Sequence, residues 1–430
     1  MGAAVTFAQS HEHYARAVLV TPGASQTGSK APGKVGPVGA SPLYLARGEG
    51  AYVWDLDGHR YVDWFNGNCA VTLGHGYQPV VDAVTTAAKQ GALLSLPSVR
   101  EAEIAERLCA VIPCAEQVRF IKTGSEACAG AVRIARMATG RDVIVCVEGQ
   151  YHGWFDWHCV TKPYHPGVPE ALAALVRTFR YNDLDSLRGV LDDTVAAVIL
   201  EPTLAEAPAE GFLRGIVDAA HGVGAVCIFD EMITGARWHI GGAQAFYGVT
   251  PDLATFGKAY ANGVAFAFIA GRAELMRHAW PISGTFGGET LGLAACGAVL
   301  DAHQEEDAPV ARMWRAGATL KTIVNAIAQR ARFGAELVGP DVRPVWRWDM
   351  DAAVKPVAQA LLQQELAARG VLVHLSGWNT SAVHGGVELD LTIDACRDSI
   401  LLVAGYLTTP DPTVHLRGEL LQAGLVRATR

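Results

Sequence analysis

The chain has 430 residues, 50% of them hydrophobic, and its formal net charge at pH 7 is −8. This length exceeds that of an ordinary single core and predicts two lobes. Charged residues make up only 18% of the chain, fewer than in typical globular proteins, which suggests that further surface is covered in an oligomer. Because the charge is negative and forms no basic stripe, neither nucleic acid nor an anionic membrane is expected as a partner.

The nine cysteines predict a reducing compartment. Their number is odd, no CxxC pair occurs, and several lie inside apolar runs, where a free thiol behaves as a small hydrophobe. This favours the cytoplasm over a disulfide framework, and no metal site is expected. The longest apolar runs, such as Val195 to Leu200, have the length of a strand, and the first residues show no basic segment followed by an apolar one. Neither a membrane span nor secretion is therefore expected.

The first 70 residues predict a helix, a loop and a hairpin. Residues 11–20 have an amphipathic pattern, residues 21–42 are rich in Gly, Pro and Ser, and residues 51–63 alternate apolar and polar side chains around Asp57-Gly58. An Asp-Gly pair between two alternating runs is a strong hairpin signal. We expect this hairpin in the smaller lobe.

The middle of the chain predicts alternating helices and strands, and one junction between them has the features of a phosphate site. The expected elements are helices at residues 79–90, 99–111 and 124–139 and strands at residues 117–121, 143–147 and 195–200. At the start of the third helix, unpaired backbone N–H groups, Gly124 for close approach and the Ser125 hydroxyl would together cradle a phosphate. The alternative is that Ser125 only caps the helix.

Candidate ligand-contacting side chains follow two of these strands. Tyr151 and His152 come after the strand at 143–147, and Glu201 comes directly after the strand at 195–200. An aromatic ring at a strand end offers a flat face to a planar ligand. His152 would either tune the surroundings of such a ring or pack behind it, and Glu201 would either join a polar network there or anchor a turn.

The segment from Gly224 to Gly263 contains the strongest chemical signal of the chain. Its apolar run at residues 225–229 predicts a buried strand that ends at Asp230, and ligands of open α/β sheets bind at such strand ends. A second short strand, ending at Gly257, is followed directly by Lys258. Burying a lysine is costly unless it is paired or neutral. An aspartate for a pyridinium nitrogen and a lysine that forms a Schiff base are what pyridoxal phosphate requires, whereas either residue alone could be a helix cap or a surface lysine.

The C-terminal part predicts a smaller α+β lobe. The expected elements are a long helix from about residue 304, strands within 333–348 and 371–374, and helices at 357–369 and 394–407.

Two phrases, FDEMITGARW and PDLATFGKAYANG, resemble the class III (ornithine-type) pyridoxal-phosphate aminotransferases, in the branch that contains glutamate-1-semialdehyde aminomutase. The aspartate of the family's DE-x-x-TG segment matches Asp230, and the lysine of its PD-x-x-x-x-GK segment matches Lys258. The similarity extends from about Ser41 to Pro344. It implies a type I pyridoxal-phosphate fold, with a mostly parallel central sheet flanked by helices and a smaller α+β lobe built from both chain ends. The implied division is an N-terminal segment at 1–70, a large cofactor-binding domain at 71–310 and a small domain at 311–430.

The resemblance also implies a role for each candidate residue of the cofactor site. Lys258 and Asp230 would be catalytic and would also contact the cofactor. The remaining cofactor contacts would be Gly124, Ser125, Tyr151, His152, Glu201, Met232 and Thr285. Tyr151 would stack on the ring. Thr285, in the segment SGTFGG, would reach the phosphate of the partner subunit, which implies a homodimer.

The reaction expected from this resemblance is transamination between a small-molecule amino donor and a carbonyl acceptor, for which a ketosugar or another specialised-metabolite carbonyl is a candidate. Three side chains are implied near the substrate: Lys30 replaces an arginine of the aminomutases, Glu206 lies near a position where they carry asparagine, and Trp64 either lines the pocket or packs at a hinge. A loop after Tyr151 that looks short, and a segment at 375–381 that lacks their glutamate, weigh against the intramolecular aminomutase, which is the alternative. A non-catalytic homologue that keeps pyridoxal phosphate is less expected, because a mere binding protein has no need of both Lys258 and Asp230.

Overall fold

The computed structural model of the chain describes residues 6–163, 165–203, 205–374 and 377–419. It divides into two compact units. Unit 1 comprises residues 1–77 and 311–430, and unit 2 comprises residues 78–310. The first boundary lies a few residues beyond the one expected from the sequence. None of the helices in the described part of the chain is both long and apolar enough to cross a membrane.

Unit 2 is built on a seven-stranded sheet with the strand order β4-β10-β9-β8-β7-β5-β6. The strands are β4 (Gln117–Ile121), β5 (Val143–Val147), β6 (Val176–Phe179), β7 (Val195–Leu200), β8 (Val226–Asp230), β9 (Leu253–Phe256) and β10 (Ala267–Gly271). From β9 to β6 the neighbours pair in parallel, whereas β10 is antiparallel to both β9 and β4. The prediction of a mostly parallel sheet is confirmed. Its central strands are buried along their whole length, which is why they read as continuous apolar runs.

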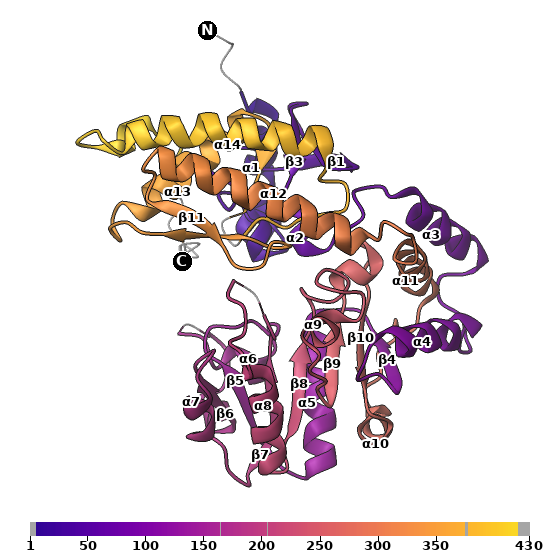
Figure 1. Cartoon of the computed structure of the whole chain (residues 1–430). Helices are drawn as coiled ribbons and strands as arrows, with labels where there is room; N and C mark the ends of the chain where they lie inside the picture. The colour runs from indigo at the N-terminus through magenta and orange to yellow at the C-terminus, as the bar shows by residue number, and fades with distance from the viewer. Residues whose placement is uncertain (1–5, 164, 204, 375–376, 420–430) are drawn as a thin grey trace. The chain divides into compact units, whose positions relative to one another are not determined.

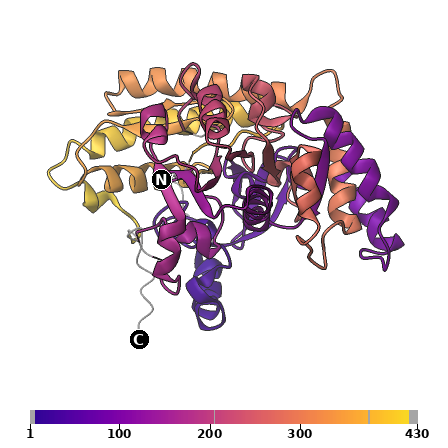
Figure 2. The same cartoon turned by 90° about the horizontal axis from the view of Figure 1, so that it is seen from below.

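Helices surround this sheet. They are α3 (Gln78–Gln90), α4 (Val99–Val111), α5 (Gly124–Thr139), α6 (Asp156–Cys159), α7 (Leu184–Arg188), α8 (Phe212–Gly222), α9 (Gly242–Tyr247), α10 (Ala273–Met276) and α11 (Thr290–Ala302). Small buried residues on α5, namely Ala127, Ala131 and Ala135, recur every four positions and let the helix approach the strands closely. Helix α11 packs against α3 and α4, and the three lie side by side in both views (Figures 1 and 2).

Unit 1 joins both ends of the chain in one sheet of order β1-β2-β3-β13, beside a two-stranded β11-β12 sheet. The strands are β1 (Leu45–Glu49), β2 (Tyr52–Asp55), β3 (Arg60–Asp63), β11 (Ala335–Val338), β12 (Val345–Trp348) and β13 (Val371–Leu372). The hairpin predicted around Asp57-Gly58 is confirmed as the antiparallel pair β2-β3. Strand β13 pairs in parallel with β3, so the expectation of a lobe built from both chain ends is confirmed.

The helices of unit 1 are α1 (Ala8–Val20), α2 (Asn66–Cys69), α12 (Pro309–Arg330, whose first residues belong to unit 2), α13 (Lys355–Ala368) and α14 (Gly386–Tyr406). Helices α13 and α14 pack against each other (Figure 1). The prediction that the last helix begins at Asp394 was wrong, because the glycine pair Gly385-Gly386 marks its start. Residues 66–69 all have a positive φ, so α2 is a single left-handed turn.

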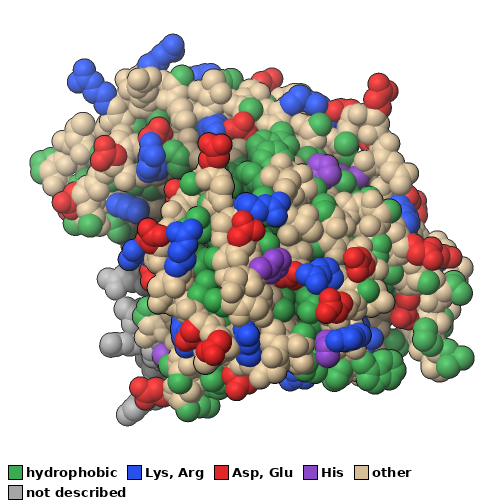
Figure 3. Space-filling view, turned by 60° about the horizontal axis from the view of Figure 1, so that its bottom comes forward, with side chains coloured by type: hydrophobic (Ala, Val, Ile, Leu, Met, Phe, Trp, Pro, Cys, Tyr) green, Lys and Arg blue, Asp and Glu red, His purple; other side chains and the backbone are tan. Residues whose placement is uncertain are grey.

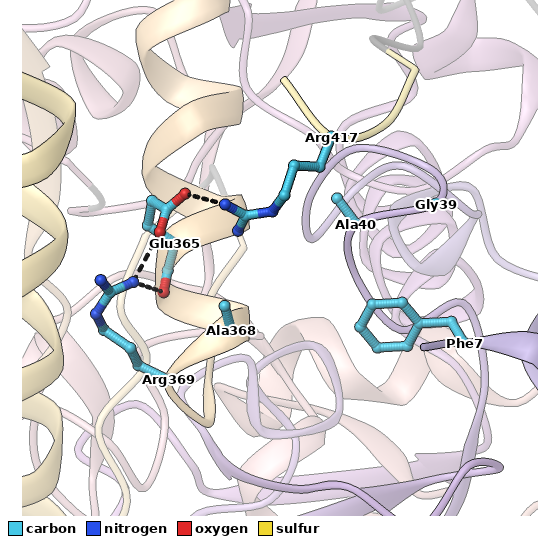
Figure 4. A pocket seen from close by; sticks show the side chains of 7 residues that line it. All are labelled: Phe7, Gly39, Ala40, Glu365, Ala368, Arg369 and Arg417. Atoms are coloured by element: carbon cyan, nitrogen blue, oxygen red, sulfur yellow. Dashed lines mark hydrogen bonds and ion pairs between the residues drawn. The ribbon is translucent and has the colours of Figure 1, made fainter. Parts of the chain in front are cut away.

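A buried acid in unit 1 holds a C-terminal segment against α13. The Glu365 carboxylate accepts hydrogen bonds from Arg369 at 2.8 Å and from Arg417 at 2.7 Å (Figure 4). The two arginines border a cavity of about 520 Å³ whose other lining residues are Phe7, Gly39, Ala40, Glu365 and Ala368. On the molecular face shown in Figure 3, acidic and basic side chains are interspersed.

Candidate active site

Asp230 ends β8 at the carboxyl edge of the parallel strands, and its buried carboxylate accepts four hydrogen bonds. One oxygen, Oδ2, lies 2.7 Å from Nδ1 of His152 and 3.2 Å from Sγ of Cys128. The other oxygen, Oδ1, accepts from the backbone N–H of Met232 at 3.1 Å and from the hydroxyl of Thr255 at 3.3 Å. Because a carboxylate can only accept, Nδ1 of His152 carries the proton of the first bond.

This donor set keeps Asp230 ionised. Burial would raise the pKa of its carboxyl, but the hydrogen bond and charge of His152, with donors from Cys128 and Met232, hold the pKa below its ordinary value. Among the described residues, no lysine or arginine forms an ion pair with Asp230. An ionised, buried carboxylate without a permanent cation beside it is suited to the cationic group of a ligand.

The neighbouring acid Glu231 does something different. Its carboxylate, also fully buried, accepts the backbone N–H groups of Ala243 at 2.6 Å and Gln244 at 2.9 Å at the start of α9. Burial raises the pKa of Glu231. Two consecutive acids at a strand end therefore face two environments, and only Asp230 belongs to the cluster around His152.

Glu201, directly after β7, is buried and contacts the loop that follows β5. Its carboxylate accepts from the backbone N–H of Tyr151 at 3.3 Å, and Gln150 bonds both backbone groups of Glu201. Burial and the negative charge of Asp230 raise the pKa of Glu201, against the opposing charges of His152 and Lys258. The two environments thus shift the pKa values of these acids in opposite directions: Asp230 favours its charged form and Glu201 its neutral form.

Lys258 lies at the same edge, because Thr255 of β9 is in register with Asp230 of β8. Lys258 follows Gly257 and adopts φ 45°, a left-handed conformation that costs about 1–2 kcal/mol for a residue other than glycine. The surrounding structure must therefore stabilise this backbone conformation. The side-chain ammonium of Lys258 forms no hydrogen bond or ion pair with the residues that the structure describes. Lys258 is half-buried and its charge acts on Glu201, which places it beside the acid cluster.

The start of α5 forms the other end of the site. Thr123 is the N-cap, in a reciprocal capping box with Glu126, so the alternative in which Ser125 caps the helix was wrong. Gly124 and Ser125 lie in the first turn, where helix geometry leaves backbone N–H groups free for an anion. The Ser125 hydroxyl accepts the backbone N–H of Trp154 at 3.3 Å.

Glycines bring these segments together. Gly153 has φ +104°, and a Cβ there would lie 2.6 Å from the Ser125 hydroxyl, so only glycine lets this loop pass over the helix start. A Cβ on Gly124 or on Gly257 would lie 3.0 Å from the sulfur of Met232. Met232 therefore packs against both the start of α5 and the residue before Lys258, as well as donating its N–H to Asp230.

Tyr151 and the buried His158 lie in the segment that follows β5. Tyr151 is 60% exposed, and its ring makes an edge contact with His158. Burial, followed by the charges of His152 and Lys162, lowers the pKa of His158 to about 3, so its imidazole is neutral. Neither ring nitrogen of His158 has a partner in the described part of the chain.

Thr285 is exposed and lines a cavity of about 270 Å³ together with Lys122, Glu126 and Phe286. Glu206 is also exposed, and its carboxylate accepts from the side-chain amide of Asn182 at 3.0 Å. Lys30 belongs to unit 1, where it is exposed and ends a short 3-10 turn that begins at Gly28.

Trp64 does not line a pocket in this structure. Its ring is completely buried in the core of unit 1, its indole N–H donates to the Thr392 hydroxyl at 2.9 Å, and it contacts Trp378 and His384. A side chain without exposed surface cannot contact a substrate, so the substrate prediction for Trp64 was wrong and the packing alternative describes it. Alternation along a strand shows that one face is buried but not what covers it.

Comparison with known proteins identifies the family of this chain. The model of the family described as aminotransferase class-III matches residues 35–382. The chain belongs to this family. Over 294 residues it is 40% identical to a glutamate-1-semialdehyde 2,1-aminomutase from Symbiobacterium thermophilum, an alignment that covers 65% of this chain and 67% of the relative.

Solved structures agree with this membership. An omega-transaminase from Sphaerobacter thermophilus superposes with a TM-score of 0.84 at 26% identity, covering 92% of this chain and 98% of that one. A glutamate-1-semialdehyde aminomutase from Pseudomonas aeruginosa superposes with a TM-score of 0.82 at 23% identity, covering 93% and 95% of the two chains, and so shows the fold alone. As a class III aminotransferase, the protein is a pyridoxal-phosphate-dependent enzyme.

The residues at this edge fit that cofactor. The ionised Asp230 lacks a permanent cation, as the carboxylate opposite a protonated ring nitrogen must. The first turn of α5, with Gly124 and Ser125, offers donors for a phosphate. A zinc ion fits this cluster less well. Tetrahedral ligand atoms about 2.0–2.3 Å from zinc lie at least ~3.3 Å from one another. Oδ2 of Asp230 lies closer than that to both possible co-ligands, at 2.7 Å from Nδ1 of His152 and 3.2 Å from Sγ of Cys128.

Sequence reasoning missed Cys128, Thr255 and His158. Cys128 lies on the apolar face of α5 and Thr255 inside β9, where each reads as a core position. Their only signal was a polar atom within a buried pattern, which needs a hydrogen-bonding partner that the sequence does not identify.

Proposed function

We propose that this protein is an aminotransferase that moves an amino group from an amine or amino-acid donor to a carbonyl acceptor, with Lys258 and Asp230 as its catalytic residues. The observation that carries the proposal is the ionised Asp230, which has no lysine or arginine partner among the described residues, on the strand next to the one that leads to Lys258. Family membership supports the reaction class.

Pyridoxal phosphate, when bound, supplies a sink for the electrons left behind when a proton leaves the substrate carbon. Asp230 holds the ring nitrogen in its protonated form, because its own carboxylate stays ionised. Nζ of Lys258, which has no hydrogen-bond or ion-pair partner among the described residues, would be the base that takes the proton from the substrate carbon. The first turn of α5 and the Ser125 hydroxyl would hold the phosphate, and Tyr151 would offer its ring as a stacking face for the cofactor.

An intramolecular aminomutase is the second candidate, and the 40% identity to an aminomutase favours it. The exposed carboxylate of Glu206 argues for the intermolecular reaction. We propose that it borders the substrate, where it would repel the carboxylate of an amino-acid aldehyde and accept hydrogen bonds from a hydroxylated or cationic substrate. Lys30 would contribute a single cationic contact to the substrate.

A labelling experiment separates the candidates. An amino donor carrying ¹⁵N is mixed with the holoenzyme and a panel of unlabelled carbonyl acceptors. An aminotransferase moves the label to a second carbon skeleton, and the donor alone converts the visible absorbance of the bound cofactor in one turnover. Label that moves only within one molecule would establish the mutase, and a cofactor spectrum that no donor changes would indicate a non-catalytic protein.

We also propose that the active unit is a homodimer in which Thr285 reaches the phosphate of the partner subunit. The exposed Thr285 beside exposed Phe286 is the feature that supports it. The Thr285→Ala variant should bind the cofactor about ten- to a hundredfold more weakly, because a hydrogen bond to a charged group is worth roughly 1.5–3 kcal/mol.

Mixed dimers of Thr285→Ala with Lys258→Ala test the crossing. If the threonine acts across the interface, one site of each mixed dimer combines an intact lysine with an intact threonine and recovers wild-type affinity and turnover. If it acts within its own chain, every site of a mixed dimer has one defect and no site recovers. A monomer in sedimentation would also exclude the shared site.

A further inference from the structure

The buried thiol of Cys128 contacts the acid that the proposed function requires. Cys128 lies on α5, almost without exposed surface, and its Sγ is 3.2 Å from Oδ2 of Asp230 and 3.6 Å from the hydroxyl of Thr255. Among the residues that the structure describes, Oδ2 has one other donor, Nδ1 of His152. One of the two described donors to this oxygen is thus a thiol.

The direction of this bond is fixed by the protonation states of its partners. Burial, followed by the negative charge of Asp230, raises the pKa of the Cys128 thiol well above its ordinary value. The thiol therefore keeps its proton at neutral pH, and the ionised Asp230 can only accept it. Cys128 is a permanent donor to the carboxylate.

We propose that Cys128 is a positioning residue that acts through Asp230: its S–H group holds the carboxylate in the ionised and oriented state in which Asp230 binds the protonated ring nitrogen of pyridoxal phosphate. This inference rests on the proposed function of Asp230. It adds a residue that touches neither the substrate nor the cofactor but sets the charge beneath the ring.

The other groups around Asp230 do not replace this donor. The titratable and charged groups that face it from the packed elements are Cys128 on α5, Tyr151 and His152 after β5, His158 on α6, Glu201 after β7 and Lys258 after β9. His158 is neutral and Glu201 is driven toward its neutral form. Thr255 and the N–H of Met232 donate to the opposite oxygen, so loss of the thiol leaves Oδ2 with His152 as its one donor from the described part of the chain.

Removing the thiol donor should make Asp230 easier to protonate. An ionised carboxylate is needed to bind a cationic ring, so cofactor affinity falls as pH decreases through the pKa of Asp230. We call this part of the affinity–pH curve the acid limb. A higher pKa of Asp230 moves the acid limb to higher pH. A thiol is a weak donor, so we expect a shift of about one pH unit or less, and an affinity about three- to tenfold below wild type on that limb.

The experiment measures cofactor affinity against pH for three variants. Cys128→Val removes the donor at similar volume, Cys128→Ser keeps a donor, and Cys146→Ala deletes another buried thiol of the same core, which has no bond to Asp230. We expect the limb to move in Cys128→Val only. Curves that coincide for Cys128→Val and wild type, or a Cys128→Ser variant that behaves like Cys128→Val, would overturn the proposal.

An analogue of pyridoxal phosphate with C–H in place of the ring nitrogen sharpens the result. It offers Asp230 no cationic partner, so Cys128→Val and wild type should bind it with the same pH dependence. An equal displacement of the acid limb with this analogue would mean that Cys128 acts on general packing and would also overturn the proposal.

The hydrogen bond itself is measurable without cofactor. In infrared difference spectra of the cofactor-free protein, the S–H stretching band lost in Cys128→Val should lie at lower frequency than the one lost in Cys146→Ala, because donation to a carboxylate weakens the S–H bond. Two bands at the same frequency would contradict the inference. Failure of the wild type to bind any cofactor would overturn the proposed function, whereas normal wild-type binding with coincident acid limbs would overturn only the role of Cys128.

Discussion

Asp230 in unit 2 and Glu365 in unit 1 are both buried acids with lowered pKa values, yet their partners differ in kind. Burial would raise the pKa of Glu365, but hydrogen bonds from Arg369 and Gln364 and the charge of Arg417 hold it below its ordinary value. Asp230 is held ionised by an imidazole, a thiol, a hydroxyl and a backbone amide.

The difference separates an acid that is neutralised by arginines of its own chain from an acid that has no lysine or arginine partner among the described residues. Two guanidinium groups neutralise Glu365 permanently and fasten the segment around Arg417 to α13 (Figure 4). The donors of Asp230 stabilise its charge without an arginine or lysine to neutralise it. Burial and a lowered pKa are common to both sites, so the charge of the partners is the informative property.

The largest expected effect comes from removing the lysine beside Asp230. Lys258→Ala should lower kcat by about a thousandfold or more, because the nucleophile and the mobile base are lost together, while the protein still binds pyridoxal phosphate. Single-turnover kinetics and cofactor titration measure the two properties. As a control, Lys321→Ala removes a lysine of unit 1 that pairs with Asp341, and should leave kcat unchanged. Activity of Lys258→Ala within tenfold of wild type would refute the assignment.

Neutralising Asp230 should slow the reaction strongly. Asp230→Asn keeps hydrogen-bonding atoms but cannot stabilise a protonated ring nitrogen, so we expect the half-reaction with an amino donor to slow by about a hundredfold or more. The free energy of unfolding of the cofactor-free protein should fall by about 1–3 kcal/mol, because the amide NH2 group of asparagine cannot accept from the two donors that face one carboxylate oxygen of Asp230. Stopped-flow and chemical denaturation report the two quantities. An unchanged half-reaction would make Asp230 a structural acid like Glu365.

A different outcome is expected for Glu365→Gln. Two arginines at a partly buried site lose their counter-charge, so the free energy of unfolding should fall by about 1–3 kcal/mol, while activity per folded molecule stays the same. Glu336→Gln is the matched control, because its pair with Arg347 is exposed and contributes little. A loss of activity without a loss of stability would show that Glu365 is more than a structural acid.

The smallest expected effect is the pH dependence of that stability. The pKa of Glu365 is lower in the folded protein than its ordinary 4.5, so its contribution is complete above about pH 5 and is lost as pH falls through the folded value. The difference in unfolding free energy between wild type and Glu365→Gln should therefore shrink as pH falls from 6 to 3.5. A difference that is constant with pH would mean that the carboxylate charge contributes nothing.

Much of the fold was predictable because its signals are local. The apolar runs at 143–147 and 195–200 coincide with β5 and β7, and the Asp-Gly turn marks the β2-β3 hairpin. The longer α14 and the true N-cap, Thr123, were missed, because several polar residues near a helix start compete for the same role and tertiary packing selects one.

The sequence by itself determined which side chains stand at the carboxyl edge of the sheet. An apolar run of strand length that ends in Asp230, and another followed by Lys258, place both residues at that edge, because parallel strands share one direction. These are properties of consecutive residues and are visible without a structure.

Only the tertiary structure decided what those side chains touch. Cys128 meets Asp230 across 102 positions of the chain, and His152 meets it across 78, through the packing of α5 and the order of the strands. The same packing put Trp64 in a core and gave Glu365 two arginines. The free energy of a buried charge depends on the few atoms within hydrogen-bonding distance, and these are set by strand register and helix packing, not by neighbours in sequence.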